Sequence, residues 1–217
     1  AAFYKMMFPN DPKLVCKKLV IMDIDQRILK QEKALISQLS SDFNIEYVQY
    51  DFRDPFPQSF LNKFDTVLTD PPYSTSGAKL FLSRAISALK EDGGKEIYFS
   101  YAHRSPERML EMQQILTEMK VSIMEIIPHM NYYEGAEILG NTTQMFTLIT
   151  TRQSMPLVKE DVKFEGPIYT GEFNRKTRFY ECSECTKTIE VSESSEFHTI
   201  EQLKAKGCPY CSKKEKF

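Results

Sequence analysis

The order of strand-like and helix-like segments constrains the fold of this chain more than any other feature. Short apolar or alternating segments, typical of strands, are separated by longer segments whose apolar residues recur with helical spacing. The strand-like segments are 19–22, 45–50, 64–69, 96–101, 121–127 and 144–150, and the helical ones are about 27–39, 77–90 and 106–120. Repeated strand–helix–strand units predict a mostly parallel sheet covered by helices. The last two strands have no helix between them, so we expect them to pair antiparallel at one edge.

This order predicts an α/β fold, a class I methyltransferase-like Rossmann domain followed by a small cysteine-containing unit. A domain of this class begins with a strand whose loop meets the cofactor, whereas residues 1–8 read as the helix that follows that strand. We therefore expect the first strand to be missing and the domain to be truncated at its N-terminus. The predicted domains are the Rossmann-like domain at 1–152, a connector packing on it at 153–178, and the small unit at 179–217.

Two of the predicted helices carry well-defined apolar faces. The helix at about 27–39 has one face formed by Ile28, Leu29, Leu35, Ile36 and Leu39. The helix at about 77–90 is expected to point Leu80, Phe81, Ala85, Ile86 and Leu89 inward. The strand at 64–69 is an apolar run that reads as buried, which is the usual pattern for a strand inside a parallel sheet.

Composition and charge narrow the range of partners. No apolar run approaches the ~20 residues of a membrane span, and residues 1–8 lack the pattern of a signal peptide. We therefore expect a cytoplasmic protein with no membrane partner. The net charge is −2, with 16 basic and 19 acidic residues in 1–150 and 12 and 11 in 151–217. Nucleic-acid binding usually requires a strongly basic face, so this balance favours a small or cationic substrate. The oligomeric state stays open, with a homodimer as one option.

The tetrapeptide Asp70-Pro71-Pro72-Tyr73 follows the apolar strand at 64–69. Ligands of open α/β sheets bind at the carboxyl ends of the strands, which is where this loop is predicted to lie. The two prolines remove two backbone donors and hold the chain extended, leaving two free carbonyl acceptors, a carboxylate before them and an aromatic ring after them. This combination suits a substrate nitrogen that loses a proton while it attacks an electrophilic carbon. The alternative is an ordinary Asp-Pro turn, which the complete tetrapeptide disfavours.

Acidic residues also end the two preceding strands. Asp23 and Asp25 follow the strand at 19–22, where an acidic residue commonly binds the ribose hydroxyls of a nucleoside cofactor. Asp23 is the better candidate, because Asp25 is also suited to capping the next helix. Asp51 ends the following strand, where it can accept a hydrogen bond from an adenine amino group or cap the turn at 51–55. Pro71 is assigned to the same cofactor site.

Two further segments are candidates for binding substrate. His103 follows the strand at 96–101 and lies on the same rim of the sheet, where a single histidine is more often a structural hydrogen bonder than a base. The segment 131–137, Asn-Tyr-Tyr-Glu-Gly-Ala-Glu, combines rings and carboxylates beside a glycine. Tyr133 and Glu134 could bind an ammonium chain by charge pairing and cation–π contact. The alternative is a solvated surface loop.

Four of the five cysteines form two Cys-x-x-Cys pairs near the C-terminus. In a chain without an export signal such pairs favour a metal over disulfides. The pairs are Cys182 with Cys185 and Cys208 with Cys211. Four thiolates complete a tetrahedral zinc site with no open position, so the metal is predicted to be structural. The segment 188–191 between the pairs is strand-like, which predicts a zinc ribbon at 179–217.

Three segments together resemble the branched-chain polyamine synthase family, the N4-bis(aminopropyl)spermidine synthases. They are Asp70-Pro71-Pro72-Tyr73, the stretch 99–107 (Phe-Ser-Tyr-Ala-His-Arg-Ser-Pro-Glu) and the stretch 131–141 (Asn-Tyr-Tyr-Glu-Gly-Ala-Glu-Ile-Leu-Gly-Asn). The resemblance covers residues 1–150, extends less surely through 166–172, and leaves the cysteine tail unmatched. It implies an enzyme that transfers aminopropyl groups from decarboxylated S-adenosylmethionine to the secondary amine of spermidine.

The resemblance also assigns roles and points to missing parts. Asp70 would orient the acceptor nitrogen, Tyr73 would pack or hydrogen-bond beside it, and Glu134 would bind a distal ammonium. The family carries a winged-helix domain and a catalytic Gly-Asp-Asp-Asp motif on the first strand, and neither is in this sequence. The fragment alone is therefore expected to lack part of its active site.

Two other functions remain open from the sequence. An Asp-Pro-Pro-Tyr loop serves equally well in an S-adenosylmethionine-dependent N-methyltransferase, which would act on an exocyclic amine of an RNA or DNA base with the tyrosine stacked on that base. The chain could also be a non-catalytic scaffold whose zinc ribbon binds a protein or nucleic acid. The charge balance argues against the first, and the absent first-strand motif is the main support for the second.

Overall fold

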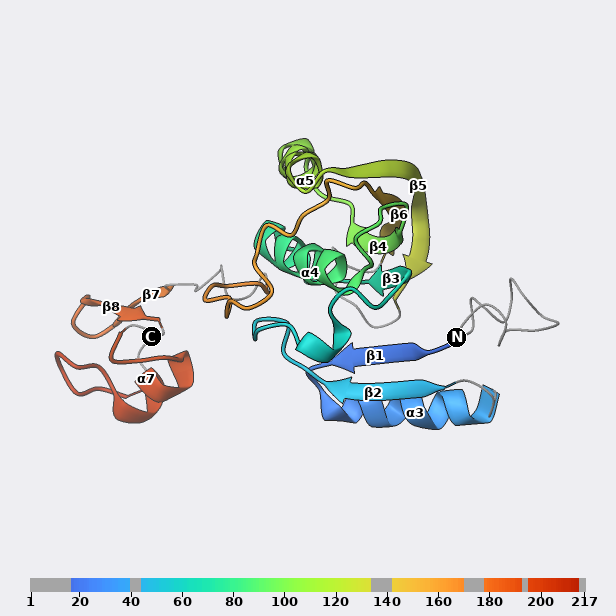
Figure 1. The fold of residues 1–217 in the computed structure, drawn as a ribbon. Coiled ribbons are helices and arrows are strands. Elements are labelled where there is room, and N and C mark those ends of the chain that lie inside the picture. Colours follow the sequence, from blue (N-terminus) through green and yellow to red (C-terminus); the bar gives the residue numbers. More distant parts are fainter. Residues whose placement is uncertain (1–16, 40–43, 134–141, 170–177, 193–194, 215–217) are drawn as a thin grey trace. The chain divides into compact units, whose positions relative to one another are not determined.

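The structure is a computed structural model that describes residues 17–39, 44–133, 142–169, 178–192 and 195–214. The chain divides into two compact units (Figure 1). The larger unit contains residues 1–71 and 78–166, and the smaller unit contains residues 72–77 and 167–217. The predicted helix at residues 1–8 lies outside the described residues.

The larger unit begins with a strand–helix–strand element. Strand β1 (Leu19–Asp23) is followed by helix α3 (Gln26–Leu39) and strand β2 (Ile45–Gln49). The two strands pair in parallel, with Leu19 opposite Ile45 and Asp23 opposite Gln49. A short 3-10 helix, η1 (Gln58–Phe60), comes next. The crossover through α3 therefore brings the carboxyl ends of β1 and β2 to the same edge of a two-stranded sheet.

A second sheet of the larger unit has four strands in the order β3-β4-β6-β5. Strand β3 (Thr66–Thr69), helix α4 (Thr75–Ala88) and strand β4 (Glu96–Ala102) form another parallel crossover. Helix α5 (Pro106–Glu118) leads into β5 (Val121–Tyr132). Strand β6 (Thr142–Thr150) is antiparallel to both β4 and β5. The predicted antiparallel pairing of the last two strands is confirmed, and β5 is five residues longer than the predicted segment because it continues to Tyr132.

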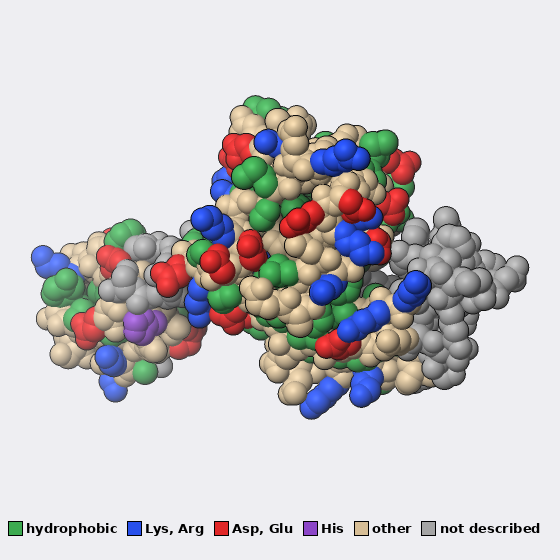
Figure 2. Space-filling model, in the orientation of Figure 1, with side chains coloured by type: hydrophobic (Ala, Val, Ile, Leu, Met, Phe, Trp, Pro, Cys, Tyr) green, Lys and Arg blue, Asp and Glu red, His purple; other side chains and the backbone are tan. Residues whose placement is uncertain are grey.

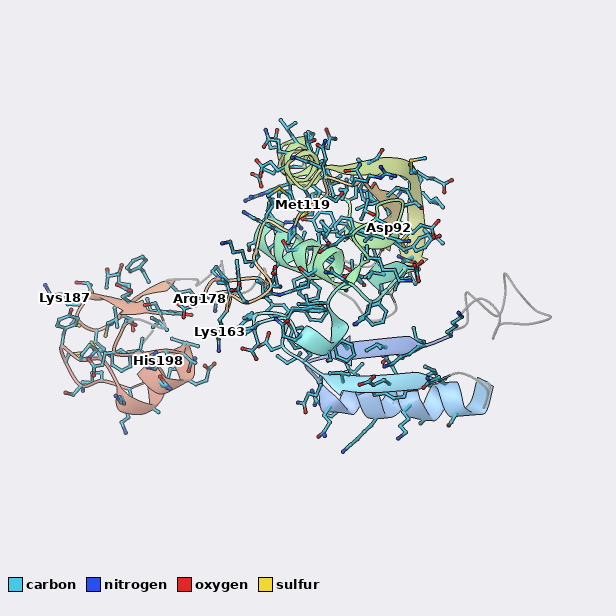
Figure 3. All side chains as sticks on the ribbon, in the orientation of Figure 1. Asp92, Met119, Lys163, Arg178, Lys187 and His198 are labelled. Carbon is cyan, nitrogen blue, oxygen red and sulfur yellow. The ribbon has the colours of Figure 1, made fainter. Side chains whose placement is uncertain are left out.

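Helix α4 supplies much of the buried surface, as its pattern predicts. Leu80, Ala85 and Ile86, and Leu89 directly after the helix, are each no more than 8% exposed. Phe81, also expected to point inward, is half-buried. Met119, labelled in Figure 3, closes the end of α5 and is fully buried. A separate group of buried side chains, Tyr50, Phe56, Phe60 and Ala88, packs against Val20 and Met22 of β1 and Val67 of β3. Apolar burial of this kind is the main favourable term in folding.

One expectation about burial is wrong. The strand at 64–69 was expected to be buried, yet Leu68 is 68% exposed. The side chain of Leu68 lies on a face of β3 that no other element covers among the described residues. On α3, for which an apolar face was predicted, Ile28 and Leu35 are 43% and 55% exposed, whereas Leu29 is 7% exposed. The spacing of apolar residues correctly identified a helix, and its apolar face is only partly covered among the described residues.

A buried arginine ties distant segments of the larger unit together. Arg84 of α4 is only 1% exposed. Its guanidinium donates to the carbonyls of Phe52 and Asp54, at 3.2 and 3.0 Å, and to those of Lys159 and Val162, at 2.7 and 2.9 Å. A planar group with five N–H donors suits several carbonyls at once. Arg84 therefore joins the loop after β2 to residues 159–162.

The smaller unit is built around a two-stranded hairpin and a short helix. Strands β7 (Arg178–Glu181) and β8 (Thr188–Val191) pair antiparallel, and helix α7 (Ile200–Lys206) follows. The Thr199 hydroxyl caps α7 by accepting from the Gln202 backbone N–H. The core consists of Cys182, Ile189, Val191, Phe197, Leu203 and Cys208. Six core side chains are few for an independent fold, so a unit of this size usually needs a covalent or metal cross-link.

The surface agrees with the balanced composition. Figure 2 shows acidic and basic side chains interspersed on the visible face of the molecule. Many of these charges form exposed pairs, such as Lys90 with Asp65 at 2.8 Å and Lys163 with Asp54 at 3.2 Å. Within the described part of the chain, no helix has the length and apolar character needed to cross a membrane.

Candidate functional site

The Asp-Pro-Pro-Tyr loop leaves the carboxyl end of β3, as predicted. Asp70 directly follows the last residue of the strand, and Pro71 is buried. The chain then turns into α4, where Ser74 caps the helix by accepting from the Gly77 N–H at 2.9 Å. The Ser74 hydroxyl also donates to the Ile168 carbonyl. This cap fixes the start of α4 five residues after Asp70.

Gly77 is required by the close packing of this turn. A Cβ atom at this position would lie 2.9 Å from the Pro72 and Ile168 carbonyl oxygens and 2.9 Å from the Ser74 hydroxyl. Two of these three neighbours are backbone atoms, which cannot move away as a flexible side chain can. The absence of a side chain at Gly77 therefore allows the loop to return so tightly after the prolines.

The side chain of Tyr133, which lies far from Asp70 in the sequence, forms a hydrogen bond with the Asp70 carboxylate. Tyr133 directly follows β5, and its hydroxyl donates to Asp70 Oδ2 at 2.7 Å across a sequence separation of 63 residues. Strands β3, β4 and β5 run in the same direction, because β4 and β5 are both antiparallel to β6. Their carboxyl ends therefore share one edge of the sheet. The structure brings together two segments that the sequence marked separately as candidates.

A buried polar network lies behind this pair. Ser100 of β4 and Thr143 of β6 are 3% and 1% exposed, and their hydroxyl oxygens lie 2.8 Å apart. The Ser100 oxygen is 3.1 Å from the Tyr133 hydroxyl. The Asn131 amide nitrogen donates to both Ser100 and Thr143, at 3.0 Å in each case. Three strands thus contribute one hydrogen-bonded cluster that ends at Asp70.

The environment shifts the pKa of the Asp70 carboxyl upward. One side of the carboxylate faces solvent, while the protein packed around the rest displaces water and disfavours the charged form. This desolvation raises the pKa of Asp70 above its usual range, and the nearby hydroxyls of Tyr133 and Ser100 act in the opposite direction. Burial also raises the pKa of the Tyr133 phenol, so this phenol keeps its proton at neutral pH. A carboxylate with a raised pKa is better matched to proton transfer near neutrality.

The acidic residues after β1 lie at the carboxyl end of that strand, as predicted. Asp23 ends β1, and its Oδ1 accepts from the Asp25 backbone N–H at 2.6 Å. Asp25 directly precedes α3, and its carboxylate accepts from the Arg27 backbone N–H at 2.8 Å and binds the Arg27 guanidinium at 2.6 Å. These bonds lower the pKa of Asp25 to about 2. The structure therefore places Asp25 as a helix cap, the alternative role that its position suggested.

Asp51 also has a local structural role. Its carboxylate accepts from the Arg53 N–H at 3.0 Å, and its carbonyl accepts from the Asp54 N–H at 2.9 Å. Both bonds shape the turn after β2. The side chain remains half-buried at the carboxyl edge of the two-stranded sheet, so a contact with a cofactor stays a prediction for Asp51 as it does for Asp23.

The remaining residues predicted to contact substrate are His103, Tyr73 and Glu134. His103 follows β4 and is exposed, with no hydrogen bond recorded for its side chain among the described residues. Tyr73 is half-buried. Glu134 lies outside the described residues. The predicted loop at 131–137 is wrong at its start, because Asn131 and Tyr132 belong to β5 and pair with Thr143 and Thr142.

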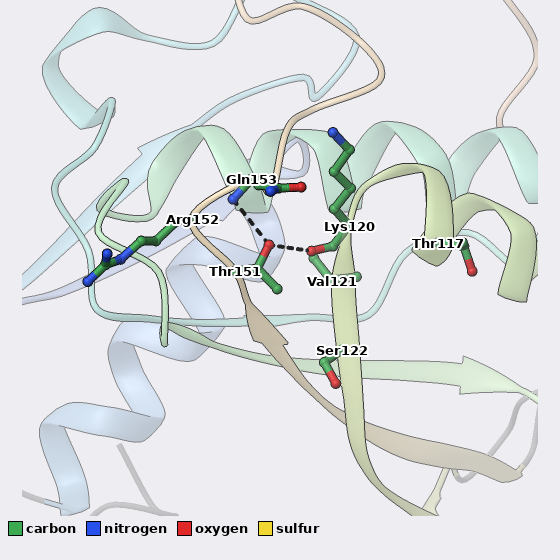
Figure 4. Close-up of a pocket in the computed structure, with 7 residues that line it drawn as sticks. All are labelled: Thr117, Lys120, Val121, Ser122, Thr151, Arg152 and Gln153. Carbon is green, nitrogen blue, oxygen red and sulfur yellow. Dashed lines mark hydrogen bonds between the residues drawn. The ribbon is translucent and has the colours of Figure 1, made fainter.

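A hollow in the described surface lies at the opposite edge of the four-stranded sheet (Figure 4). It has a volume of about 560 Å³ and is lined by Thr117, Lys120, Val121, Ser122, Thr151, Arg152 and Gln153. The Thr151 hydroxyl donates to the Lys120 carbonyl at 2.9 Å. The hollow lies where β5 begins and β6 ends, so it is separated by the length of these strands from Asp70 and is not the candidate site.

The four C-terminal cysteines converge in the smaller unit. Their sulfur atoms all lie within 4.8 Å of one another. Cys182 Sγ is 3.7 Å from Cys211 Sγ, and Cys185 Sγ is 3.6 Å from Cys208 Sγ. A tetrahedron with metal–sulfur bonds of about 2.3 Å has edges of about 3.8 Å. The cluster therefore has the size and ligand chemistry that zinc requires.

The backbone around each cysteine pair has the same geometry. The Cys182 carbonyl accepts from the Thr186 N–H at 2.8 Å, and the Cys208 carbonyl accepts from the Ser212 N–H at 2.8 Å. Thr186 and Ser212 both adopt positive φ, 56° and 59°. The backbone N–H of Cys182 and of Cys208 each donates to the carbonyl five residues later, at 3.0 and 2.8 Å. Two equivalent turns thus present the four sulfur atoms to one point.

Sequence reasoning missed two important groups. Ser100 and Thr143 are polar residues in strands, which a pattern of alternation usually assigns to the solvent face. Arg84 lies within an apolar helix face, and nothing in the local sequence indicates that its partners are carbonyls of distant segments. One signal in the sequence could have identified Ser100 as part of the site. This residue lies near the carboxyl end of β4, the strand next to β3, and Asp70 directly follows β3.

Parallel crossovers and a carboxylate at the carboxyl edge define the larger unit as a Rossmann-like α/β unit. The profile of one family, described as the branched-chain polyamine synthase A C-terminal domain, matches residues 12–196. The chain belongs to this family. The match confirms the family predicted from the sequence and extends past residue 150 to include Cys182 and Cys185, while Cys208 and Cys211 lie beyond it.

Individual relatives agree with the family match. The chain is 38% identical over 191 residues to an uncharacterized protein of Methanocaldococcus jannaschii, covering 87% of this chain and 46% of that protein. It is 36% identical over 131 residues to the N(4)-bis(aminopropyl)spermidine synthase of the same organism, covering 59% of this chain and 36% of that protein. The chain thus spans less than half the length of either relative.

A solved structure supports the fold. The branched-chain polyamine synthase from Thermus thermophilus, in complex with N4-aminopropylspermidine and 5'-methylthioadenosine, matches with a TM-score of 0.60 and 24% identity. The match covers 72% of this chain and 49% of that chain. At this identity the comparison establishes the shared Rossmann-like fold.

Proposed function

We propose that this chain forms the acceptor side of an aminopropyltransferase site. In this proposal, an aminopropyl group moves from decarboxylated S-adenosylmethionine to the secondary amine of spermidine, and a branched-chain polyamine results. The observation that carries the proposal is the 2.7 Å hydrogen bond from Tyr133 to Asp70. It joins the Asp-Pro-Pro-Tyr loop to the Asn-Tyr-Tyr segment in a chain that belongs to the branched-chain polyamine synthase family.

The proposed role of Asp70 follows from its position and its raised pKa. A secondary ammonium must lose a proton before its nitrogen can attack the methylene carbon next to sulfur. The new N–C bond forms as the C–S bond breaks, the sulfur keeps the electron pair, and 5'-methylthioadenosine leaves. The Asp70 carboxylate would accept the proton or hold the free amine in line, and such assistance is worth about 10²–10⁴ in rate. Tyr73 would pack beside the acceptor.

Ligands named for the Thermus thermophilus relative support this chemistry. That protein is described with a polyamine and with 5'-methylthioadenosine, the thioether expected when decarboxylated S-adenosylmethionine gives up its aminopropyl group. In this chain, Asp23 and Asp51 would contact the nucleoside of the donor, and the Pro71 carbonyl would face the same side. Asp25 would act by capping α3, because Arg27 already occupies its carboxylate. Tyr133, Glu134 and His103 remain proposed contacts of the polyamine.

The four-cysteine cluster is proposed to hold a structural zinc ion. Its sulfur spacing and its two equivalent turns support this assignment, and four thiolates leave no position open for a substrate. The ion would cross-link the two turns of the smaller unit. We also propose domain boundaries at residues 152 and 178, with a connector between them. A cytoplasmic location is a further proposal.

The test of the function is a transfer assay with the natural protein that contains this chain. Incubation with spermidine and decarboxylated S-adenosylmethionine is expected to give a branched polyamine by mass spectrometry. Asp70→Asn is expected to lower kcat by at least about 10²-fold, because it removes the proton acceptor. Asp65→Asn is the matched control: it makes the same charge change at the amino end of β3, where Asp65 is exposed and paired with Lys90.

The competing function has its own signature in the same assay. Methylation of RNA or DNA by S-adenosylmethionine, with no product from spermidine, would replace the proposal by the base methyltransferase. Equal turnover of Asp70→Asn and Asp65→Asn would remove Asp70 from the mechanism while leaving the reaction itself in place.

A further inference from the structure

We propose that Ser100 and Thr143, oriented by Asn131, are positioning residues that fix the Tyr133 phenol as a hydrogen-bond donor to Asp70. The inference deepens the function proposed above and rests on it for its catalytic meaning. Its structural basis is a continuous row of oxygen atoms running from Thr143 through Ser100 and Tyr133 to the carboxylate of Asp70, with separations of 2.8, 3.1 and 2.7 Å.

The direction of every hydrogen bond in this row follows from counting protons. An ionised carboxylate only accepts, so the single Tyr133 hydroxyl proton is used on Asp70. The contact between Tyr133 and Ser100 then requires the proton of Ser100. With that proton spent, the contact between Ser100 and Thr143 requires the proton of Thr143. All three hydroxyls therefore donate in the direction of Asp70.

Asn131 completes this arrangement. Its amide nitrogen carries two protons, and it donates one to Ser100 and one to Thr143, each at 3.0 Å. Ser100 therefore accepts from Asn131 and Thr143 and donates once, which uses its full hydrogen-bonding capacity. Ser100 has no remaining way to turn its proton away from the Tyr133 end of the row.

The burial of the row gives it a functional consequence. Thr143 and Ser100 are 1% and 3% exposed, so their dipoles are held by the sheet and are not averaged by solvent. Aligned hydroxyl dipoles favour negative charge on Asp70 and oppose the desolvation that raises its pKa. They also occupy Oδ2, the oxygen facing Tyr133, so that a substrate ammonium would approach the carboxylate from its solvent-facing side.

The first measurement does not depend on catalysis. The Asp70 carboxyl carbon is followed by NMR as a function of pH in the parent chain and in variants. Among the described residues, the hydroxyls of Tyr133 and Ser100 are the groups that lower the pKa of Asp70, and neither is charged at neutral pH. Thr143→Val removes one hydroxyl without changing the shape of the side chain, and the pKa of Asp70 is expected to rise. Thr143→Ser restores the hydroxyl and is expected to restore the parent value.

A matched control and a second variant keep the test decisive. Ser87→Ala removes a buried hydroxyl that, among the described residues, bonds only a helix carbonyl, that of Ser83 at 3.1 Å, and is expected to leave the pKa of Asp70 unchanged. Ser100→Ala breaks the row at its centre and is expected to raise the pKa of Asp70 as Thr143→Val does. An unchanged pKa of Asp70 in a folded Thr143→Val or Ser100→Ala protein would overturn the proposal, as would an equal change in Ser87→Ala.

Kinetics of the natural full-length protein then test the catalytic meaning. Thr143→Val is expected to lower kcat by about 3- to 10-fold, the value of one hydrogen bond, with KM for spermidine unchanged and with rescue by Thr143→Ser. A rise in KM alone would overturn the positioning role. If the pKa changes occur but no polyamine is formed by any variant or by the parent, the row stands and the proposed function fails.

Discussion

At the scale of single residues, Asp70 combines exposure to solvent with a pKa that its surroundings raise. Desolvation disfavours the carboxylate, and the nearby hydroxyls of Tyr133 and Ser100 partly offset this effect. A carboxyl group with a raised pKa in the folded state contributes stability at low pH, and this contribution is lost as pH rises through the folded pKa. Ionisation of Asp70 in the folded protein therefore has a cost in stability, as is common for functional carboxylates.

Tyr133→Phe tests this balance. The phenol donates to the carboxylate and so favours its charged form, and its removal is expected to raise the pKa of Asp70 further. Because the reaction needs the ionised form, the acidic limb of kcat/KM is expected to move to higher pH, while turnover on the alkaline side of that limb falls less. The measurement is the pH profile of the full-length protein. A profile identical to that of the parent would show that the phenol does not support the charge on Asp70.

At the scale of secondary-structure elements, Arg84 determines how the loop after β2 is held. Its four carbonyl partners belong to two segments, 52–54 and 159–162. These segments are about a hundred residues apart in the sequence. The Phe56 N–H reinforces the same pairing by donating to the Glu160 carbonyl at 2.6 Å. Asp51 lies at the start of this loop, so a helix residue far from the edge of the sheet positions a predicted cofactor contact.

Arg84→Met is expected to lower the free energy of unfolding by about 3–5 kcal/mol, because buried carbonyls lose a charged donor. Methionine is similar in length and apolar, so the change tests the hydrogen bonds more than the packing. Arg108→Met is the control, since Arg108 is exposed and pairs only with Glu111 at 2.9 Å among the described residues; its effect is expected within about 0.5 kcal/mol. The measurement is denaturant unfolding of both variants. Equal decreases in the free energy of unfolding of the two variants would contradict a special role for Arg84.

The sequence predicted the elements better than their surroundings. Strand ends at Asp23 and Asp70 could be located because an acidic residue follows an apolar run, and α4 because its inward face is regular. Periodicity states which face of an element is apolar, not whether another element covers it, so the exposure of Leu68, Ile28 and Leu35 could not be predicted. The pairing of Asp70 with Tyr133 depends on the order β3-β4-β6-β5, which short-range patterns do not contain.

At the scale of the whole molecule, the described strands form separate sheets where a Rossmann domain would have one. Strand β1 pairs only with β2, and β3 pairs only with β4, among the described residues. Side chains of β1 and β3 nevertheless join one apolar cluster. Curated relatives are more than twice as long as the matched region.

Metal removal tests the smaller unit by itself. Because its core holds only six buried side chains, binding of zinc by the four cysteines would supply much of its folding free energy. A chelator is expected to release close to one equivalent of zinc and to unfold residues 178–214, seen as loss of dispersed NMR signals from Ile189 and Val191. Signals from Ile97 and Phe99 of β4 are expected to remain. Retention of the Ile189 signals after complete chelation would contradict a structural role for the metal.

The two edge strands of the four-stranded sheet, β3 and β5, have no further partner strand among the described residues, and this bears on how the chain behaves when concentrated. Leu68 is exposed on the strand at one edge, and Met124 and Met130 are 65% and 46% exposed on the strand at the other. An unpaired edge that carries apolar side chains is a template for strands of other molecules. The isolated chain is therefore prone to aggregation through lengthening of its sheet, and light scattering should increase steeply with protein concentration.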